Sequence, residues 1–93
     1  GTLIEVLGDT AAALAPFSEA EAERLLSKLE IARLLAGVRG APPSDITALA
    51  RWVSRFSVMV AALADDLAEI DVNPVIASPS GALAVDALVI PKR

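Results

Sequence analysis

Three polar residues near the C-terminal end of the chain have types and a spacing that suit a hard cation. Asp71 and Asn73 lie in a segment where apolar and polar residues alternate, and Asp86 follows thirteen residues after Asn73 inside an apolar run. Mg²⁺ in proteins takes oxygen ligands, commonly one or two carboxylates together with substrate phosphates. Asn73, Asp86 and Asp71 are therefore candidate metal ligands, provided that the fold brings them to one face.

The segment 67–73 has the two-residue period of a β-strand. Its alternation places the polar side chains Glu69, Asp71 and Asn73 on one face. The other face then holds the apolar side chains Ala68, Ile70 and Val72. Pro74 has no amide donor, so we expect an edge position or a local distortion directly after this strand.

An antiparallel hairpin would bring Asp86 to the polar face. The turn at residues 78–81 leads into a second apolar run, 82–90, which we predict to be a strand. If this turn is the loop, Asn73 lies opposite Asp86 with Cβ atoms about 5 Å apart. A two-residue loop at 80–81 shifts the partners by one pair but keeps Asp86 on the same face. An odd loop or a bulge would break the pairing.

Two interpretations of this polar face remain open. Like charges so close together are costly unless a cation lies among them, which favours a metal site. The alternative is a solvated outer face of a half-exposed hairpin. Asp86 argues for the metal site because it interrupts the apolar run 83–89 in the middle of the predicted strand.

Composition excludes several other chemistries. The chain has no cysteine and no histidine, which excludes disulfides, thiolate nucleophiles, imidazole catalysis and most transition-metal sites. Its net charge of −4 offers no electrostatic basis for binding nucleic acid. No uncharged apolar stretch approaches the roughly 20 residues of a membrane span, and no secretory signal is visible. We therefore expect a cytoplasmic protein with no nucleic-acid or membrane partner.

The N-terminal third predicts two short strands and a capped helix. The strands are expected at residues 2–7 and 11–15, the second stopped by Pro16. Ser18 followed by Glu21 forms a capping box, which predicts the start of a helix. One apolar stripe on this helix is opposite a charged face. The stripe consists of Ala22, Leu25, Leu26 and Leu29, and the charged face of Glu19, Glu23, Lys28 and Glu30.

A second, longer helix follows a short helical stretch at 31–36 and a loop at 37–44 that contains two glycines and a proline pair. Ser44 or Asp45 caps this helix, which reaches about Ala64. It carries two adjoining apolar stripes: Ile46, Leu49, Ala50, Val53, Ser57, Val60 and Ala64, and beside them Trp52, Phe56, Met59 and Leu63. Such a helix usually packs between two layers. The alternative is an alanine-rich helix over one sheet.

The chain is unusually apolar for its size. Hydrophobic residues make up 55% of it, and only three of its residues are aromatic. A chain this short buries only about 60–65% of its unfolded surface. An apolar excess in so short a chain can also mean that part of the surface packs against something outside the sequence.

Four motifs in the expected order resemble one family. Residues 69–76 (EIDVNPVI), followed by 85–87 (VDA), resemble the end of the ATP-grasp domain in nucleoside-diphosphate-forming acyl-CoA synthetases. That group includes ADP-forming acetyl-CoA synthetase and, more distantly, the succinyl-CoA synthetase β subunit. Residues 1–9 (GTLIEVLGD), 14–18 (LAPFS) and 34–40 (LLAGVRG) resemble three further motifs of the family.

The resemblance implies the fold and the site. The fold class would be α+β, with residues 1–93 as the C-terminal subdomain of an ATP-grasp fold, its helices packed on a mostly antiparallel sheet that ends in a β-hairpin. The cofactors would be Mg²⁺ and ATP. Asn73 and Asp86 would ligate the Mg²⁺ that bridges the nucleotide phosphates, and Asp71 occupies the acidic position two residues before the asparagine.

The resemblance also implies a larger protein. Its parent would interconvert carboxylate, CoA and ATP with acyl-CoA, ADP and phosphate. Family members relay phosphate through a histidine, and this chain has no histidine, no glycine-rich phosphate loop and no CoA-binding domains. No catalytic residue is therefore assigned, and we expect the fragment alone to be inactive. Glu5, Asp9 and Arg39 match family positions, but no chemistry can be assigned to them; for Arg39 we favour a structural role in its loop.

The expected partners are the nucleotide, the CoA-binding domains and the remainder of the ATP-grasp domain, which would cover the apolar face. The competing hypothesis is a non-catalytic interaction module that binds a partner, or a second copy, through the helix face around Trp52, Phe56 and Met59. A third hypothesis adds an acetyltransferase domain to the parent protein. No residue of the chain bears on that third hypothesis.

Overall fold

The structure is a computed structural model of the 93-residue chain, and it describes residues 4–7, 10–30, 32–35, 37, 45–72 and 75–92. The described elements are β1 (Ile4–Leu7), β2 (Thr10–Ala13), α1 (Glu19–Ser27), α2 (Ala32–Leu35), α3 (Ile46–Ala62), β3 (Leu67–Val72), β4 (Val75–Ser78), β5 (Gly81–Ala84) and β6 (Ala87–Pro91). All strand pairs are antiparallel: β1 with β2, β3 with β6 and β4 with β5. The predicted α+β class is confirmed.

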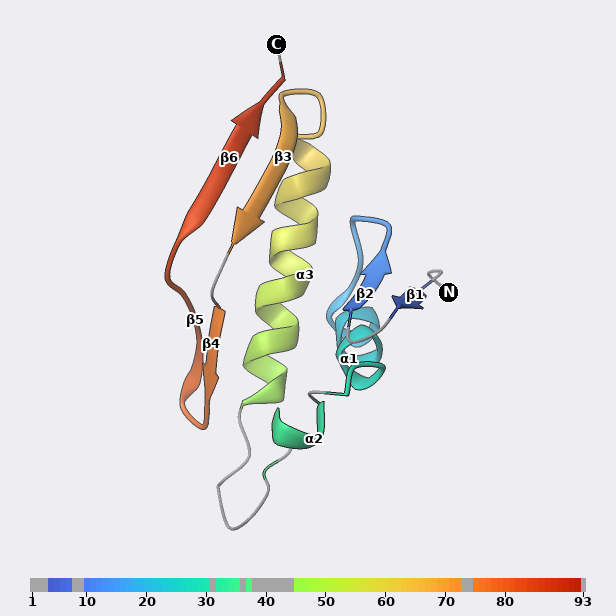
Figure 1. Cartoon of the computed structure of the whole chain (residues 1–93), viewed down its shortest axis with the longest axis vertical. Helices are drawn as coiled ribbons and strands as arrows, with labels where there is room; N and C mark the ends of the chain where they lie inside the picture. Colours follow the sequence, from blue (N-terminus) through green and yellow to red (C-terminus); the bar gives the residue numbers. More distant parts are fainter. Residues whose placement is uncertain are drawn as a thin grey trace.

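Helix α3 runs through the middle of the molecule (Figure 1). The strand pairs β3–β6 and β4–β5 lie on one side of it, and α1 with the β1–β2 hairpin lies on the other. No helix in the described part of the chain is both long enough and apolar enough to cross a membrane. The predicted loop at 37–44 lies outside the described residues, apart from Gly37.

The N-terminal elements follow their local signals. Strand β2 ends at Ala13, two residues earlier than predicted, and Leu14 is 80% exposed. Ser18 is the N-cap of α1, and its Oγ accepts a hydrogen bond from the Glu21 N–H at 3.1 Å. The Ser18 hydroxyl in turn donates to Glu21 Oε1 at 3.4 Å. The predicted helix start is thus confirmed, although the glutamate contacts the serine hydroxyl and not the serine N–H of a standard capping box.

The core lies between α1 and α3. Its buried apolar residues are Ala22 and Leu26 of α1 and Leu49 and Ala50 of α3. Because both alanines are fully buried, the two helices can approach closely where these small side chains meet. Apolar side chains of β4 and β5 pack against the same core from the other side of α3: Val75, Ala77 and Ala82. The prediction that α3 packs between two layers is therefore correct.

The boundaries and the buried face of α3 differ in part from the prediction. Asp45 is its N-cap, with Oδ1 accepting from the Ala48 N–H at 2.9 Å, while Ser44 lies outside the described residues. The helix ends at Ala62, so Ala64 lies beyond it. Ser54 is buried although it belongs to neither predicted stripe.

The burial of Ser54 has a structural reason. Ser54 and Ser57, the two buried serines of α3, form hydrogen bonds to the segment that leads into α1. The Ser54 hydroxyl donates to the Phe17 carbonyl at 2.7 Å, and the Phe17 N–H donates to Ser57 Oγ at 3.1 Å. Ser57 Oγ also lies 2.6 Å from the Ser54 carbonyl, to which it donates. A buried backbone amide requires such partners. The polar positions of α3 therefore position the strand-to-helix connection.

We expect Ser57→Ala to lower the free energy of unfolding by about 1–3 kcal/mol, because the Phe17 N–H would lose its partner. The measurement is urea denaturation followed by circular dichroism. Ser27→Ala is the matched control, since the Ser27 hydroxyl donates to the Arg24 carbonyl on the exposed side of α1. It should change stability by less than about 0.5 kcal/mol. Equal effects of the two variants would contradict the proposed role of Ser57.

Candidate magnesium site and apolar groove

The hairpin β4–β5 has the register expected from the first of the two predicted loops. Ala77 pairs with Ala82, and Ser78 pairs with Gly81 across a two-residue turn. Gly81 has a φ of +147°, a conformation that L side chains rarely adopt. The turn prediction is therefore confirmed.

The pairing of β3 with β6 follows the same register as the pairing of β4 with β5. Val72 pairs with Ala87 and Asp71 with Leu88, as the same loop predicts. Asn73 lies outside the described residues, so its pairing with Asp86 stays a prediction. The register on both sides of that pair nevertheless agrees with it.

The second predicted strand, 82–90, is in fact two strands. Strand β5 ends at Ala84 and β6 begins at Ala87, so Val85 and Asp86 belong to neither. Asp86 Oδ1 accepts a hydrogen bond from the Ala87 N–H at 2.8 Å. Aspartate side chains that bond to neighbouring backbone groups compete with the ladder bonds of a sheet. The residue that marked the candidate site is thus also the residue that interrupts the strand.

The first predicted strand, 67–73, also needs a correction. In the described residues β3 ends at Val72, and the pairing with β6 shifts between Leu67 and Glu69. Ala68 lies at this irregularity and is exposed, although the alternation placed it on the apolar face. Such a bulge changes the face on which the neighbouring residues lie. Ile70 and Val72 keep the predicted inward direction, and Asp71 is exposed.

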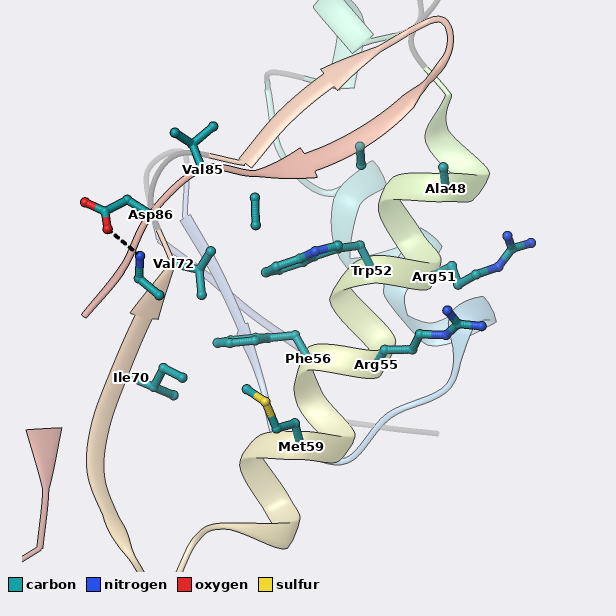
Figure 2. Close-up of a pocket in the computed structure, with 13 residues that line it drawn as sticks. Ala48, Arg51, Trp52, Arg55, Phe56, Met59, Ile70, Val72, Val85 and Asp86 are labelled. Atoms are coloured by element: carbon teal, nitrogen blue, oxygen red, sulfur yellow. Dashed lines mark hydrogen bonds between the residues drawn. The ribbon is translucent and has the colours of Figure 1, made fainter. Parts of the chain in front are cut away.

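The two described candidate ligands, Asp71 and Asp86, lie on the solvent side of the strand ladders. Both Asp71 and Asp86 are exposed, and the Asp86 carboxylate points away from α3 (Figure 2). Its Oδ1 is held by the Ala87 N–H, which restrains the carboxylate and leaves Oδ2 open. No group of three or more His, Cys, Asp or Glu side chains is arranged for a metal among the residues that the structure describes. The candidate donors are these two carboxylates and the predicted Asn73 carbonyl oxygen, an all-oxygen combination that would suit Mg²⁺.

An apolar groove of about 810 Å³ lies beside this site, between α3 and the strands (Figure 2). Trp52, Phe56 and Met59 form one wall, and Ile70 and Val72 of β3 form the opposite wall. The rings of Trp52 and Phe56 are stacked, with centroids 5.2 Å apart and planes inclined by 15°. Trp52, Phe56 and Met59, three of the four residues of the second predicted apolar stripe, thus line the same groove. The fourth, Leu63, is the C-cap of α3 and does not line the groove.

Two arginines of α3 lie at the rim of the groove. Arg51 and Arg55 contribute to its lining, but their guanidinium groups point away from the aromatic rings (Figure 2). Arg51 Nε lies 3.4 Å from Glu19 Oε1 of α1. No sequence motif points to these arginines, and their spacing of four residues on one helix is the only signal for their shared face. The groove is therefore lined mainly by apolar side chains, with Arg51 and Arg55 on the α3 side and Asp86 on the opposite side.

The chain matches the ATP-grasp domain family over residues 1–90. It belongs to that family. Over 81 residues this ATP-grasp domain is 37% identical to the 4-hydroxybutyrate–CoA ligase [ADP-forming] of Nitrosopumilus maritimus, a match that covers 87% of the chain and 12% of the ligase. It is 34% identical to the β subunit of acetate–CoA ligase [ADP-forming] II of Pyrococcus furiosus over 94 residues, which cover 99% of the chain and 40% of that subunit.

Solved structures agree with these relatives. The ATP-grasp domain superposes on the dinucleotide forming acetyl-coenzyme A synthetase 1 of Ca. Korarchaeum cryptofilum with a TM-score of 0.79 and 36% identity. The match covers 89% of this chain and 38% of that one. That protein was solved with coenzyme A and Mg-AMPPCP, its phosphohistidine segment pointing towards the nucleotide binding site.

These comparisons confirm the resemblance seen in the motifs. The chain spans less than half the length of the relatives it matches. Those relatives are parts of larger multi-domain or multi-subunit acyl-CoA synthetases. Domains of the ATP-grasp family use ATP with Mg²⁺.

Proposed function

We propose that residues 1–93 form the C-terminal portion of the ATP-grasp domain of an ADP-forming acyl-CoA synthetase and supply the Mg²⁺-binding half of its nucleotide site. The observation that carries this proposal is the shared register of β3–β6 and β4–β5, with a strand break at Asp86 between the two ladders. The family membership and the Mg-AMPPCP complex of a relative support it.

The proposed ligands are Asn73 and Asp86, with Asp71 as a further acidic group. Bound Mg²⁺ would neutralise charge that develops as the phosphoryl group moves. The Ala87 N–H holds the carboxylate of the exposed Asp86 through Oδ1, and the second carboxylate oxygen, Oδ2, is the proposed ligand atom. Asp71 pairs with Leu88, two residues beyond Asp86, and on a regular strand such positions share a face. The chain's own contribution is therefore to position oxygen atoms.

The proposed reaction of the whole protein is the interconversion of carboxylate, CoA and ATP with acyl-CoA, ADP and phosphate. The names of the relatives support this reaction class. The proposed partners are the nucleotide, the CoA-binding domains and the remainder of the ATP-grasp domain, in a cytoplasmic setting. Because the 93 residues contain no histidine to relay phosphate, we expect no acyl-CoA synthesis by this chain alone.

A metal titration tests the site directly. We expect Mg²⁺ to shift backbone amide NMR signals of residues 71–73 and 86–88, and ATP to strengthen that response because its phosphates supply further ligands. Substoichiometric Mn²⁺ should broaden the same signals, which makes even weak binding visible. Signals around Asp65 and Asp66, an exposed acidic pair in the turn after α3, serve as the control. A response spread equally over all exposed carboxylates would contradict the proposal.

A non-catalytic interaction module remains the second candidate, because the groove beside Trp52 and Phe56 is apolar and open. In that case the acidic face is simply solvated. The same titration separates the two candidates: no localised response at Asp86, with or without ATP, favours the interaction module. A localised response favours the nucleotide half-site.

A further inference from the structure

One face of α3 is exposed along most of the helix. The side of α3 that holds its buried residues packs in the core, and the side that carries Trp52 lines the groove. A third side consists of residues that recur at helical spacing and are all exposed: Arg51, Arg55, Val58 and Ala62. We call these four residues the outer stripe of α3.

The outer stripe is followed by charges of the opposite sign. Arg51 and Arg55 occupy its N-terminal half, and their guanidinium groups point away from the aromatic rings of the groove (Figure 2). Asp65 and Asp66 lie in the exposed turn directly after α3, where the Asp66 N–H donates to the Leu63 carbonyl at 2.9 Å. That bond holds the acidic turn against the end of the helix. The surface therefore presents two cations, then two small apolar side chains, then two anions.

This order of charges is complementary to its own reverse. If two copies of α3 pack antiparallel about a twofold axis at Val58, the residue seven positions before Val58 lies opposite the residue seven positions after it. Arg51 of one copy then lies opposite Asp65 of the other, and the twofold axis repeats the contact. Since a helix rises about 1.5 Å per residue, each pair lies about 10 Å from the axis. Arg55 lies one turn nearer to the axis and extends toward the same acidic turn.

The middle of the outer stripe suits contact between two helices. Val58 is apolar and 54% exposed. Ala62 has a small side chain, which lets two helix axes approach to the usual distance of about 8–10 Å. Val58 does not line the groove, so this contact differs from an association of two copies through Trp52.

The existing partner of Arg51 does not prevent such a contact. Arg51 Nε lies 3.4 Å from Glu19 Oε1, and the two side chains are 48% and 50% exposed. An ion pair this exposed contributes little to stability. A guanidinium group has several donors, so Arg51 can bind Glu19 and a second carboxylate together. The net charge of −4 repels two copies at long range, and the local match of opposite charges opposes that repulsion at contact.

We propose that the outer stripe of α3 is an isologous interface through which two copies of this chain associate. The two helices are antiparallel, with Arg51 and Arg55 of one copy against Asp65 and Asp66 of the other. This inference goes beyond the proposed function and does not depend on the Mg²⁺ site.

A charge-swap experiment with sedimentation equilibrium tests the interface. The acidic variant combines Arg51→Glu with Arg55→Glu, and the basic variant combines Asp65→Arg with Asp66→Arg. We expect the unaltered chain to self-associate, and each variant alone to associate at least about tenfold more weakly, because like charges then face each other. An equimolar mixture of the two variants should recover the original affinity within about threefold, because every facing pair is again opposite in sign.

Two further variants separate the interface from net charge and from folding. Arg24→Glu combined with Lys28→Glu is the matched control, because it makes the same charge change at exposed positions four residues apart on and next to α1. It should alter association by less than about twofold. Val58→Asp places two carboxylates at the twofold axis and should weaken association at least about tenfold. Circular dichroism confirms that each variant is folded.

Three results would overturn the proposal. One is a chain that stays monomeric at millimolar concentration. Another is self-association that neither charge variant weakens, which would assign it to the groove. The third is a mixture of the acidic and basic variants that associates no better than either alone. Because neither metal nor nucleotide is present, these results are independent of the Mg²⁺ titration.

Discussion

Replacing Asp86 by Asn is expected to weaken Mg²⁺ binding by the domain by about 10–100-fold or more. The substitution removes the negative charge but retains an Oδ1 acceptor for the Ala87 N–H, which now bonds at 2.8 Å. The local backbone should therefore persist while the proposed charged ligand is lost. The measurement is the Mn²⁺ broadening and Mg²⁺ titration of the backbone amides, with and without ATP.

The comparison with Asp86→Ala separates ligation from backbone support. Alanine removes both the charge and the acceptor, so it should lose metal binding and also shift the Ala87 amide in the metal-free spectrum. Glu69→Gln is the matched control, because Glu69 pairs with Ile90, farther along the same ladder. It should leave the titration unchanged. If Asp86→Asn binds like the unaltered chain and only Asp86→Ala is impaired, Asp86 acts through its hydrogen bond and the proposed ligand role is wrong.

Leu49→Ala is expected to lower the free energy of unfolding by about 2–5 kcal/mol. The described core has four buried apolar residues, and two of them are alanines. Leu26 and Leu49 are therefore the two large side chains among the buried residues of this core. Since domains have roughly 0.05–0.15 kcal/mol of stability per residue, a loss of this size is a large part of the total.

Urea denaturation followed by Trp52 fluorescence and circular dichroism measures this effect. We expect a lower midpoint with an unchanged slope, because the change affects stability and not the surface exposed on unfolding. Leu14→Ala is the matched control, because Leu14 is 80% exposed and the chemical change is identical. It should alter stability by less than about 0.5 kcal/mol. Similar losses in the two variants would show that the packing between α1 and α3 does not dominate the stability.

Local signals in the sequence determined much of this fold. The Ser18 cap, the apolar stripe of α1 and the two-residue period of β3 depend on residues close together in the chain, so their physics can be read from sequence order. The turn at Ser78–Gly81 set the register of both ladders, because one residue of slip would move every side chain to the other face. The motifs likewise identified the family.

Other features depend on contacts that the sequence does not display. Ser54 is buried because the Phe17 carbonyl, 37 residues away, accepts its hydroxyl. At the break between β5 and β6 the Ala87 N–H donates to the Asp86 carboxylate, and alternation alone does not reveal such a bond between a side chain and the backbone.

The groove is the clearest case of a feature that only the tertiary structure decided. The sequence predicted that Trp52, Phe56 and Met59 share a helix face, because helical periodicity follows from spacing alone. That Ile70 and Val72 form the opposite wall depends on how β3 is placed against α3. Such placement results from packing between segments distant in sequence, and that packing has no local signature.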